Sequence, residues 1–264
     1  MSRVVVVKLG GHALDAAESF EDAIDSLARD LATLVTEGVA PVIVHGAGPQ
    51  ISALMRDLGI PSEFVEGFRV TDERTMEIVS MALGHVNQLL VAGLNHRGVA
   101  AEGVAGPDGR LLTASLRGRR WGRAGGEIKV RVDALRSVAD RGAVAVVNPV
   151  AVDAKGRLVN CNADSVAGAI SAALGAEALV LLSDVDQLRL DPDDPKTAVS
   201  SVTRARVLEL VASGAIREGM RPKMDAALNA VDAGAARVVV TNGARNNALS
   251  DALNRRGLYT EVTR

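Results

Sequence analysis

Two lysines that lie far apart in the sequence each stand where a negatively charged ligand would bind. Lys8 follows a run of four valines and precedes Gly10 and Gly11, and glycines let a ligand approach the backbone N–H groups closely. Lys223 follows Pro222, which favours the first turn of a helix, so its charge would oppose the helix dipole. A bound polyanion would offset that repulsion. The pattern therefore indicates a phosphate ligand, with a solvated lysine as the alternative at each position.

A glycine-rich segment, Gly46-Ala47-Gly48, lies between an apolar run and an amphipathic stretch. A loop that leads from a strand into a helix presents free N–H groups and the positive end of the helix dipole to an anion. The dinucleotide-binding fingerprint needs a third glycine where Ile51 stands, and the Walker A motif needs a Gly-Lys-Ser/Thr sequence that is missing. The segment therefore predicts an anion loop of neither common type.

Polar side chains that suit a small acid or its partners gather in two further segments. Arg69 lies just before a predicted helix, and a guanidinium can bind a carboxylate through two parallel hydrogen bonds. A surface ion pair with one of the acidic residues that follow it is the alternative. Asn160, Asn162 and Asp164 cluster before another predicted helix. Capping of that helix by Asn162 or Asp164 is the alternative there, although a cap does not need all three.

The elements that position these motifs follow from a regular alternation along the chain. Short runs of Val, Ile and Leu without polar alternation predict strands buried on both faces, as in parallel sheets. Stretches with a 3.6-residue period lie between them and predict helices, so the class is α/β with a mainly parallel sheet. The predicted strands are Val4–Val7, Pro41–Val44, Ala143–Val147, Leu179–Leu182 and Arg237–Val240. The predicted helices are Phe20–Glu37, Gln50–Leu58, Thr71–Arg97, Ala163–Leu174, Arg204–Ala212 and Pro222–Ala233.

Turns follow four of the predicted strands and begin at Lys8, His45, Ser183 and Thr241. In open α/β sheets, ligands bind outside the carboxyl ends of the strands. We therefore expect all four turns to line one rim of the sheet. The segment 99–126 is rich in Gly and Arg with weak periodicity, and we expect it to form short antiparallel strands or a lid over that rim.

Composition narrows the class of protein. The 264 residues are 48% hydrophobic but only 2% aromatic, so the core must be built from Ala, Val, Leu and Ile. The net charge of −2 provides no global attraction to nucleic acid or to an anionic membrane. Cys161 is the single cysteine, which excludes an intrachain disulfide. We see no signal-peptide pattern and no uninterrupted apolar run of membrane-spanning length, so we expect a cytoplasmic protein.

Taken together and in this order, the motifs resemble the acetylglutamate kinases, a group within the amino-acid kinase family. The resemblance runs from about Val4 to about Gly243. It implies an open αβα sandwich in a single kinase domain over residues 1–264, with an acyl-amino-acid lobe over 1–175 and a nucleotide lobe over 176–264. It also implies a homodimer. The motifs that carry it are Lys8-Leu-Gly-Gly, Gly67-Phe-Arg-Val-Thr-Asp, Asn160-x-Asn-Ala-Asp, Leu182-Ser-Asp-Val and Gly219-Met-x-x-Lys.

The resemblance also implies roles for individual residues. Lys8 and Lys223 would stabilise the transferring phosphoryl group, and Asp164 would orient both lysines. No residue is assigned as a metal ligand, because Mg²⁺ would be held mainly by the nucleotide phosphates. The implied substrate contacts are Ala47, Gly48, Arg69 and Asn160. The implied nucleotide contacts are Gly10, Gly11, Ser183, Asp184, Gly219 and Met220.

The activity that the resemblance implies is ATP-dependent phosphorylation of the side-chain carboxylate of N-acetyl-L-glutamate, in arginine biosynthesis. A carboxylate is already a nucleophile, so the reaction needs positioning and positive charge rather than a general base. The alternative is a kinase for glutamate or aminoadipate linked to a carrier protein. The basic run from Arg117 to Arg123 would contact an acidic carrier, and a solvated loop is the other interpretation of that run. A binding protein without catalysis is disfavoured, because Lys8, Asp164 and Lys223 are all present.

Two features depart from the family pattern. The family loop usually contains three glycines, but Ala47 stands in the middle here, which would cost about 1 kcal/mol if its φ were positive. The sequence also does not include the extra N-terminal helix that the resemblance links to hexamers and arginine feedback. We therefore expect a dimer with weak or no inhibition by arginine.

Overall fold

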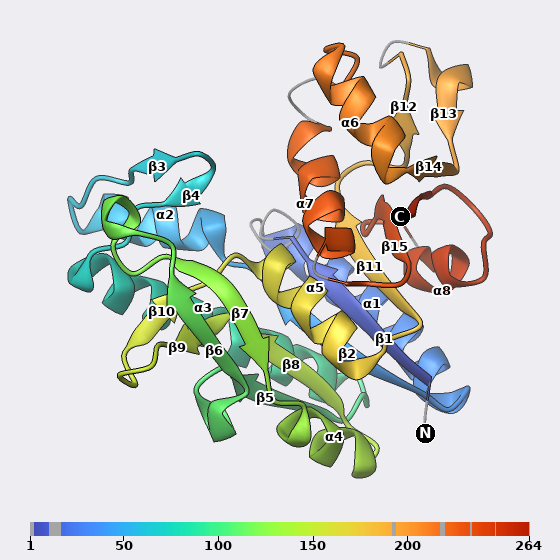
Figure 1. Cartoon of the computed structure of the whole chain (residues 1–264). Coiled ribbons are helices and arrows are strands. Elements are labelled where there is room, and N and C mark those ends of the chain that lie inside the picture. The colour runs from blue at the N-terminus through green and yellow to red at the C-terminus, as the bar shows by residue number, and fades with distance from the viewer. Residues whose placement is uncertain are drawn as a thin grey trace.

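A mostly parallel sheet runs through the centre of the molecule (Figure 1). The computed structural model describes residues 3–10, 17–191, 194–216, 220–232, 234–245 and 247–263. Within these residues the sheet has eight strands in the order β14-β16-β15-β11-β1-β2-β8-β5, and only the contact between β15 and β16 is antiparallel. The strands are β1 (Arg3–Leu9), β2 (Val39–His45), β5 (Ala101–Ala105), β8 (Val144–Asn148), β11 (Ala178–Ser183), β14 (Ser201–Thr203), β15 (Val238–Asn242) and β16 (Thr260–Thr263).

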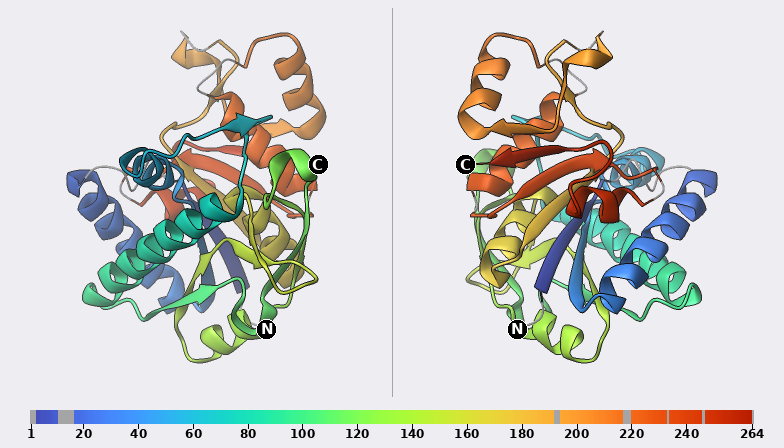
Figure 2. Two further views of the ribbon diagram at one scale, coloured as in Figure 1. Left: turned by 90° about the vertical axis from the view of Figure 1, so that its left-hand side faces the viewer. Right: turned by 90° about the vertical axis from the view of Figure 1, so that its right-hand side faces the viewer.

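Helices cover both faces of this sheet, because its strands bury side chains on both sides (Figure 2). Val5 and Val7 of β1 pack into one apolar cluster, whereas Val6 packs into the other. The predicted αβα sandwich is therefore confirmed. The first cluster contains α1 (Ala17–Thr36), α2 (Gly48–Asp57), α3 (Glu73–His96) and α8 (Ala248–Leu253), and the second contains α4 (Asp133–Asp140), α5 (Ala163–Leu174), α6 (Arg204–Ala212) and α7 (Arg221–Asp232).

Smaller sheets complete the architecture. A four-stranded sheet has the order β10-β9-β6-β7, and a two-stranded hairpin is formed by β3 and β4. The expectation of antiparallel strands in the segment 99–126 is confirmed for β6, which pairs antiparallel with β7. It is wrong for β5, which pairs parallel with β8 because its residues Ala101 and Val104 are buried at the edge of the central sheet. The bounds are β3 (Phe64–Val65), β4 (Phe68–Arg69), β6 (Leu112–Leu116), β7 (Gly125–Val130), β9 (Val150–Val152), β10 (Leu158–Asn160), β12 (Leu188–Arg189) and β13 (Ala198–Val199).

The five predicted strands and six predicted helices are all present, with ends that differ by a few residues. Helix α3 begins at Glu73 rather than Thr71, because the Asp72 carboxylate accepts a hydrogen bond of 2.7 Å from the N–H of Thr75 and caps the helix. By length and composition α3 would cross a bilayer. Its Ile78 and Leu90 are nevertheless fully buried in the apolar cluster, as in the core helix of a globular domain.

The loop between β6 and β7 is tied to the chain just before α3. The carbonyl oxygen of Trp121 accepts a hydrogen bond of 3.1 Å from the N–H of Thr71, and the carbonyl oxygen of Thr71 accepts one of 2.6 Å from the N–H of Arg123. Gly122 lies between these bonds with φ +62°, and a Cβ atom there would clash with the Thr71 carbonyl. The position therefore requires glycine on two grounds, backbone conformation and space.

Replacing Gly122 by alanine should lower the free energy of unfolding by about 2 kcal/mol or more, because strain and a clash with backbone add together. Urea denaturation measures the change. Gly59→Ala is the matched control, because Gly59 has φ +69° but a Cβ atom there would meet nothing within 4 Å, so it should cost only about 1 kcal/mol. Equal losses in the two variants would show that the contact between Gly122 and Thr71 does not constrain the loop.

Candidate functional site

The four predicted turns lie at one rim of the central sheet. Strands β1, β2, β11 and β15 are parallel. Leu9, at the end of β1, is in register with His45 of β2 and Leu182 of β11, and Ser183 is in register with Asn242 of β15. The carboxyl ends of the four strands therefore face the same side, and the prediction of a common rim is confirmed.

A cavity of about 280 Å³ lies at this rim. It brings together six of the seven residues predicted to be catalytic or to contact the substrate, all but Lys223: Lys8, Ala47, Gly48, Arg69, Asn160 and Asp164. Apolar side chains from separate segments form much of the remaining wall, including Ile51, Phe64, Phe68 and Leu83. Its walls thus combine fixed charges with an apolar surface, as in sites for small organic acids.

An ion pair joins Lys8 to the opposite wall. The Lys8 Nζ atom lies 2.9 Å from the Asp164 carboxylate, and the two side chains are only 17% and 18% exposed. The side chain of Asn162 accepts hydrogen bonds of 2.8 Å and 3.1 Å from the N–H groups of Asp164 and Ser165 and so caps α5. The capping alternative is therefore confirmed for Asn162, and it leaves the Asp164 carboxylate with Lys8.

The anion loop leads directly into α2. Ala47 is the N-cap residue with φ −150°, so the expected penalty for alanine at positive φ does not arise. An alanine side chain cannot cap a helix, which leaves the N–H groups of the first turn of α2 without a side-chain acceptor from that residue. Ala47, Gly48 and Pro49 all line the cavity, so this helix start presents backbone donors and the positive end of a dipole to it.

Arg69 is buried against the wall of the cavity, with 7% exposure. Its guanidinium donates hydrogen bonds of 2.7 Å to the hydroxyl groups of Ser52 and Ser62 and lies 4.6 Å from the centre of the Phe64 ring. Burial lowers the pKa of Arg69, but a guanidinium stays charged at physiological pH. The alternative of a surface ion pair is therefore wrong, because α2 and the β3–β4 hairpin enclose the side chain.

The β3–β4 hairpin owes its geometry to a two-residue turn. Glu66 and Gly67 have φ values of 53° and 79°, as in the type I′ turns that match the twist of paired strands. The turn folds Arg69 back to pair with Phe64. The sequence reasoning missed Ser52 and Ser62. Nothing in their local sequence distinguishes them, because they meet Arg69 only after the hairpin folds over α2.

A short chain of hydrogen bonds connects Asn160 to the same region. The Asn160 side-chain amide donates a hydrogen bond of 3.0 Å to the Thr71 hydroxyl, which donates one of 2.8 Å to the Arg69 carbonyl oxygen. Asn160 and Arg69, which the resemblance pairs as substrate contacts, are therefore linked through Thr71. Thr71 is fully buried and was not among the predicted site residues.

The predicted nucleotide contacts lie farther along the rim. The Lys223 Nζ atom lies 2.8 Å from the Asp184 carboxylate, and this contact lowers the pKa of Asp184. The Ser183 hydroxyl donates a hydrogen bond of 3.2 Å to the same carboxylate. The Met220 carbonyl oxygen accepts a hydrogen bond of 3.1 Å from the N–H of Lys223 at the start of α7. The role of Asp164 in orienting Lys223 stays a prediction.

Of the three glycines predicted to contact the nucleotide, the structure describes only Gly10. Gly10 follows β1, and a Cβ atom there would lie 4.0 Å from Lys8 Nζ, which places its backbone beside the cation. Gly11 and Gly219 lie outside the described residues.

Two titratable side chains at the site do not suit catalysis. Cys161 lines the cavity, but burial raises the pKa of its thiol to about 12, so the nucleophilic thiolate is scarce. Burial lowers the pKa of His45 to about 4, so its imidazole is neutral. The neutral ring contacts the Asn87 side chain at 3.1 Å and the Gly46 carbonyl oxygen at 3.3 Å. His45 therefore helps to hold the start of the glycine-rich loop in place through these two contacts.

The basic run differs from a solvated loop. Arg117 stacks on the Phe68 ring with its guanidinium carbon 3.4 Å from the ring centre, and Arg123 is buried with 5% exposure. Arg117 is nevertheless exposed, as are Arg119 and Arg120, the other two arginines of the run. The solvated-loop interpretation is therefore wrong for Arg123, whereas Arg117 is exposed although it stacks on Phe68.

Comparison with known proteins agrees with this geometry. Residues 3–242 match the sequence model of the amino acid kinase family. The chain is 38% identical to the acetylglutamate kinase of Archaeoglobus fulgidus, over 99% of this chain and 93% of that protein. It is 37% identical to the chloroplastic acetylglutamate kinase of Arabidopsis thaliana, over 99% of this chain and 75% of that protein.

A solved structure of N-acetylglutamate synthase from Neisseria gonorrhoeae, complexed with coenzyme A and N-acetyl-glutamate, is also similar. Its TM-score is 0.82 at 25% identity, and the match covers 99% of this chain but 59% of that chain. Carbamate kinase from Giardia lamblia bound to AMP-PNP has a TM-score of 0.70 at 17% identity, over 100% of this chain and 99% of that chain. The second likeness concerns the fold alone.

Replacing Lys8 by methionine should lower kcat for phosphoryl transfer by about 10²–10³, as when one donor to a developing negative charge is removed. Steady-state ADP release measures it. Lys129→Met is the control, because Lys129 is exposed on β7 and its loss should leave kcat unchanged. A near-normal kcat in the Lys8 variant would remove Lys8 from the phosphoryl-transfer step.

The buried imidazole of His45 should make stability depend on pH. In the unfolded chain His45 binds a proton below its ordinary pKa of 6.5, whereas in the folded chain it does so only below about pH 4. Between these two pH values the unfolded state binds more protons, so the free energy of unfolding falls as the pH falls. The free energy of unfolding of the wild type, relative to that of His45→Gln, should therefore decrease by up to about 3 kcal/mol as the pH falls from 6.5 to about 4. Urea denaturation at stepped pH measures it, with His96→Gln at an exposed position as control. A constant difference would mean that His45 is protonated in the folded state.

Proposed function

The chain belongs to the amino acid kinase family, and on that premise we propose that it transfers the γ-phosphoryl group of ATP to the side-chain carboxylate of N-acetyl-L-glutamate. The observation that carries the proposal is the cavity that contains both the Lys8–Asp164 ion pair and the buried Arg69. One end offers a cation for a phosphoryl group, and the other offers a guanidinium for a carboxylate. Full-length similarity to acetylglutamate kinases identifies the acid.

In this reaction the substrate carboxylate oxygen attacks the γ-phosphorus. A new O–P bond forms, the bond from the γ-phosphorus to the bridging oxygen breaks, and that oxygen leaves with ADP. No proton has to move, so the protein needs positive charge and alignment rather than an acid or a base. Lys8, held by Asp164, would stabilise the charge on the transferring group. Arg69 would hold the substrate's other carboxylate, with the acetyl group against apolar wall residues such as Phe64.

The donors at the rim suit a polyphosphate. Lys8 and Lys223 supply ammonium groups, and Gly10 leaves the backbone beside Lys8 accessible. Lys223 would exchange its contact with Asp184 for phosphate oxygens when ATP binds. Mg²⁺, held mainly by the nucleotide phosphates, would neutralise charge on the phosphate oxygens during transfer.

We also propose that the single kinase domain is organised in two lobes, one for the acid substrate and one for the nucleotide. Every residue that lines the cavity lies between positions 8 and 164, which supports an acyl-amino-acid lobe over residues 1–175. Ser183, Asp184, Met220 and Lys223 all follow position 175, which supports a nucleotide lobe over residues 176–264. The resemblance further supports a homodimer that works in the cytoplasm.

A carrier-linked substrate has less support. The argument for it was that the basic run from Arg117 to Arg123 would contact an acidic carrier. In the structure, however, Arg117 stacks on Phe68 and Arg123 donates a hydrogen bond to the Leu158 carbonyl oxygen. Arg120 also lies over the Trp121 ring, 5.9 Å from its centre, so three of the four arginines contact other groups of the same chain. The free acetylated acid fits a cavity of about 280 Å³ without a docking surface.

The test is ADP release with ATP and Mg²⁺ when N-acetyl-L-glutamate, N-acetyl-L-aminoadipate and free L-glutamate are offered in parallel. We expect the highest kcat/KM with N-acetyl-L-glutamate. Arg69→Lys should raise its KM by about tenfold, because a point charge replaces a two-pronged donor. Arg56→Lys, on the exposed side of α2, is the matched control. Preference for free glutamate, or an unchanged KM in the Arg69 variant, would contradict the proposal.

A further inference from the structure

Two side chains in hydrogen-bond contact, His45 and Asn87, lie directly behind the glycine-rich loop. His45 is the last residue of β2 and is fully buried, and Asn87 lies on α3. The Asn87 amide nitrogen lies 3.1 Å from the His45 Nε2 atom and 2.9 Å from the Val146 carbonyl oxygen of β8. Neither residue is among those that line the cavity with Lys8, so neither has a part in the phosphoryl transfer described above.

The Val146 carbonyl oxygen fixes the orientation of the Asn87 amide. A carbonyl oxygen only accepts hydrogen bonds, so the end of the amide that faces it is the NH₂ group. The same nitrogen faces His45 Nε2, which must therefore be the acceptor of that contact. Burial lowers the pKa of His45 to about 4, so the ring is neutral and carries its proton on Nδ1. Asn87 thus selects the tautomer of His45.

A glycine in the neighbouring strand makes room for this amide. Gly103 of β5 pairs with Val146, and a Cβ atom at position 103 would overlap the Asn87 amide oxygen. Gly103 is not among the glycines with a positive φ, so space rather than backbone conformation requires glycine here. The close packing over the strand pair restricts the amide plane, and with it the direction in which Asn87 donates.

The proton on His45 Nδ1 points to the first peptide of the glycine-rich loop. Nδ1 lies 3.3 Å from the Gly46 carbonyl oxygen, and the N–H of Gly46 donates a hydrogen bond of 3.1 Å to the Leu9 carbonyl oxygen. The N–H of Ala47 belongs to the same trans peptide as the Gly46 carbonyl group, so the two point in opposite directions. The carbonyl faces His45 behind the loop, and the N–H therefore faces the cavity that Gly46 and Ala47 line. Within the described part of the chain this N–H has no acceptor.

We propose that His45 and Asn87 are positioning residues that direct the Ala47 N–H toward the oxygens of the transferring phosphoryl group. The inference rests on the proposed phosphoryl transfer. Asn87 sets the His45 tautomer, and His45 holds the peptide between Gly46 and Ala47. Negative charge spreads over the phosphoryl oxygens in the transition state, and a donor that is fixed in advance stabilises it without reorganisation. With the other tautomer the Nδ1 lone pair would face the Gly46 carbonyl oxygen, and their repulsion would turn the peptide away.

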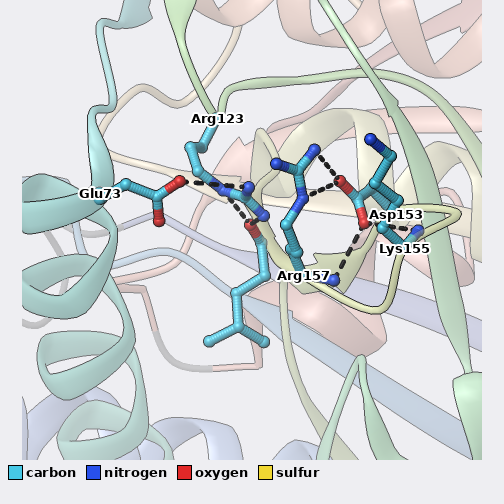
Figure 3. Close-up of polar contacts among 6 residues, drawn as sticks. Glu73, Arg123, Asp153, Lys155 and Arg157 are labelled. Atoms are coloured by element: carbon cyan, nitrogen blue, oxygen red, sulfur yellow. Dashed lines mark hydrogen bonds and ion pairs between the residues drawn. The ribbon is translucent and has the colours of Figure 1, made fainter.

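A different buried side chain supports the acid end of the cavity and supplies a comparison. Arg123 donates a hydrogen bond of 2.7 Å to the Leu158 carbonyl oxygen (Figure 3). Its own N–H and carbonyl group bond to Thr71 and Asn160, and these two residues connect to Arg69. Arg123→Lys should therefore raise the KM for the acid and leave kcat within about threefold of the wild type.

Two near-isosteric variants of His45 test the proposal. The amide nitrogen of asparagine lies the same number of bonds from Cβ as Nδ1 of histidine, and that of glutamine the same number as Nε2. His45→Asn therefore keeps a donor for the Gly46 carbonyl oxygen, whereas His45→Gln moves it toward Asn87. In ADP release with N-acetyl-L-glutamate we expect kcat within about threefold of the wild type for His45→Asn and at least about tenfold lower for His45→Gln, with KM unchanged in both. Equal kcat in the two variants, whether normal or reduced, would refute the proposal.

Asn87→Ala tests the second step. Alone it releases the His45 tautomer and should lower kcat by at least about tenfold. In a chain that already carries His45→Asn it should change kcat by less than about threefold, because an amide has no tautomer to set. Asn95→Ala is the matched control, since Asn95 also lies on α3 and its amide donates to a strand carbonyl, that of Ala101, so its loss should leave kcat unchanged.

Two outcomes of these measurements would contradict the assignment. An undiminished effect of Asn87→Ala in the His45→Asn chain would mean that Asn87 does not act through the tautomer. A loss of kcat in Arg123→Lys or Asn95→Ala as large as that in Asn87→Ala would mean that any loosening of the surrounding structure slows the reaction. Thermal denaturation confirms that each variant is folded under the conditions of the assay.

The tautomer itself can be measured without reference to activity. The chain has four histidines, and ¹⁵N NMR of histidine-labelled protein distinguishes protonated from unprotonated ring nitrogens. The His45→Gln spectrum assigns the signals of His45. We expect a proton on Nδ1 and none on Nε2 in the wild type, and a mixture of tautomers in Asn87→Ala. A proton on Nε2 in the wild type would overturn this inference, whereas a wild type that releases no ADP with any acid would contradict the proposed function instead.

Discussion

The ion pair between Lys8 and Asp164 is the interaction on which the arrangement of the cavity depends. It joins the carboxyl end of the central strand β1 to the first turn of α5, which covers one face of the sheet. Partial burial of two charges costs hydration free energy. The attraction between them and the favourable position of Asp164 at a helix N-terminus offset part of that cost. An ammonium group is thereby fixed at a point where a free lysine side chain would move.

A second fixed charge, Arg69, shows how a buried cation is tolerated without a carboxylate. Two serine hydroxyls accept its hydrogen bonds, and the Phe64 ring covers its face. Hydroxyls are weaker partners than carboxylates, so an acid substrate gains by replacing them. Arg123 repeats this design beside α3, with a backbone carbonyl and a distant glutamate as its partners. Arg69 and Arg123 are joined through Thr71, whose hydroxyl bonds to the Arg69 carbonyl oxygen and whose carbonyl oxygen accepts from the N–H of Arg123. Neither cation is therefore positioned independently of the other.

The sequence was most informative where the local pattern was strong. Strands of β-branched residues and helices with clear periodicity were located to within a few residues, because both periods follow from backbone geometry. Short elements without such a pattern, such as α8 with six residues and the two-residue strands of the β3–β4 hairpin, form because the surrounding fold supports them. Of the candidate residues, Lys8, Ala47, Gly48, Arg69, Asn160 and Asp164 do meet around one cavity. The resemblance implied Asp164 as the partner of Lys8, whereas the partners of Arg69 and Asn160, which are Ser52, Ser62 and Thr71, were not predicted.

The sequence by itself determined the α/β class, the rim at which the turns gather, and the types of charged residue placed there, because strand direction and residue chemistry are properties of the chain. Only the tertiary structure decided which charge meets which. It paired Lys8 with Asp164 and Lys223 with Asp184, and it enclosed Arg69 between serines rather than beside an acidic neighbour. It also buried Arg123 inside a run whose composition is typical of a basic surface. Such contacts join residues far apart in sequence, and no local pattern encodes the distance between them.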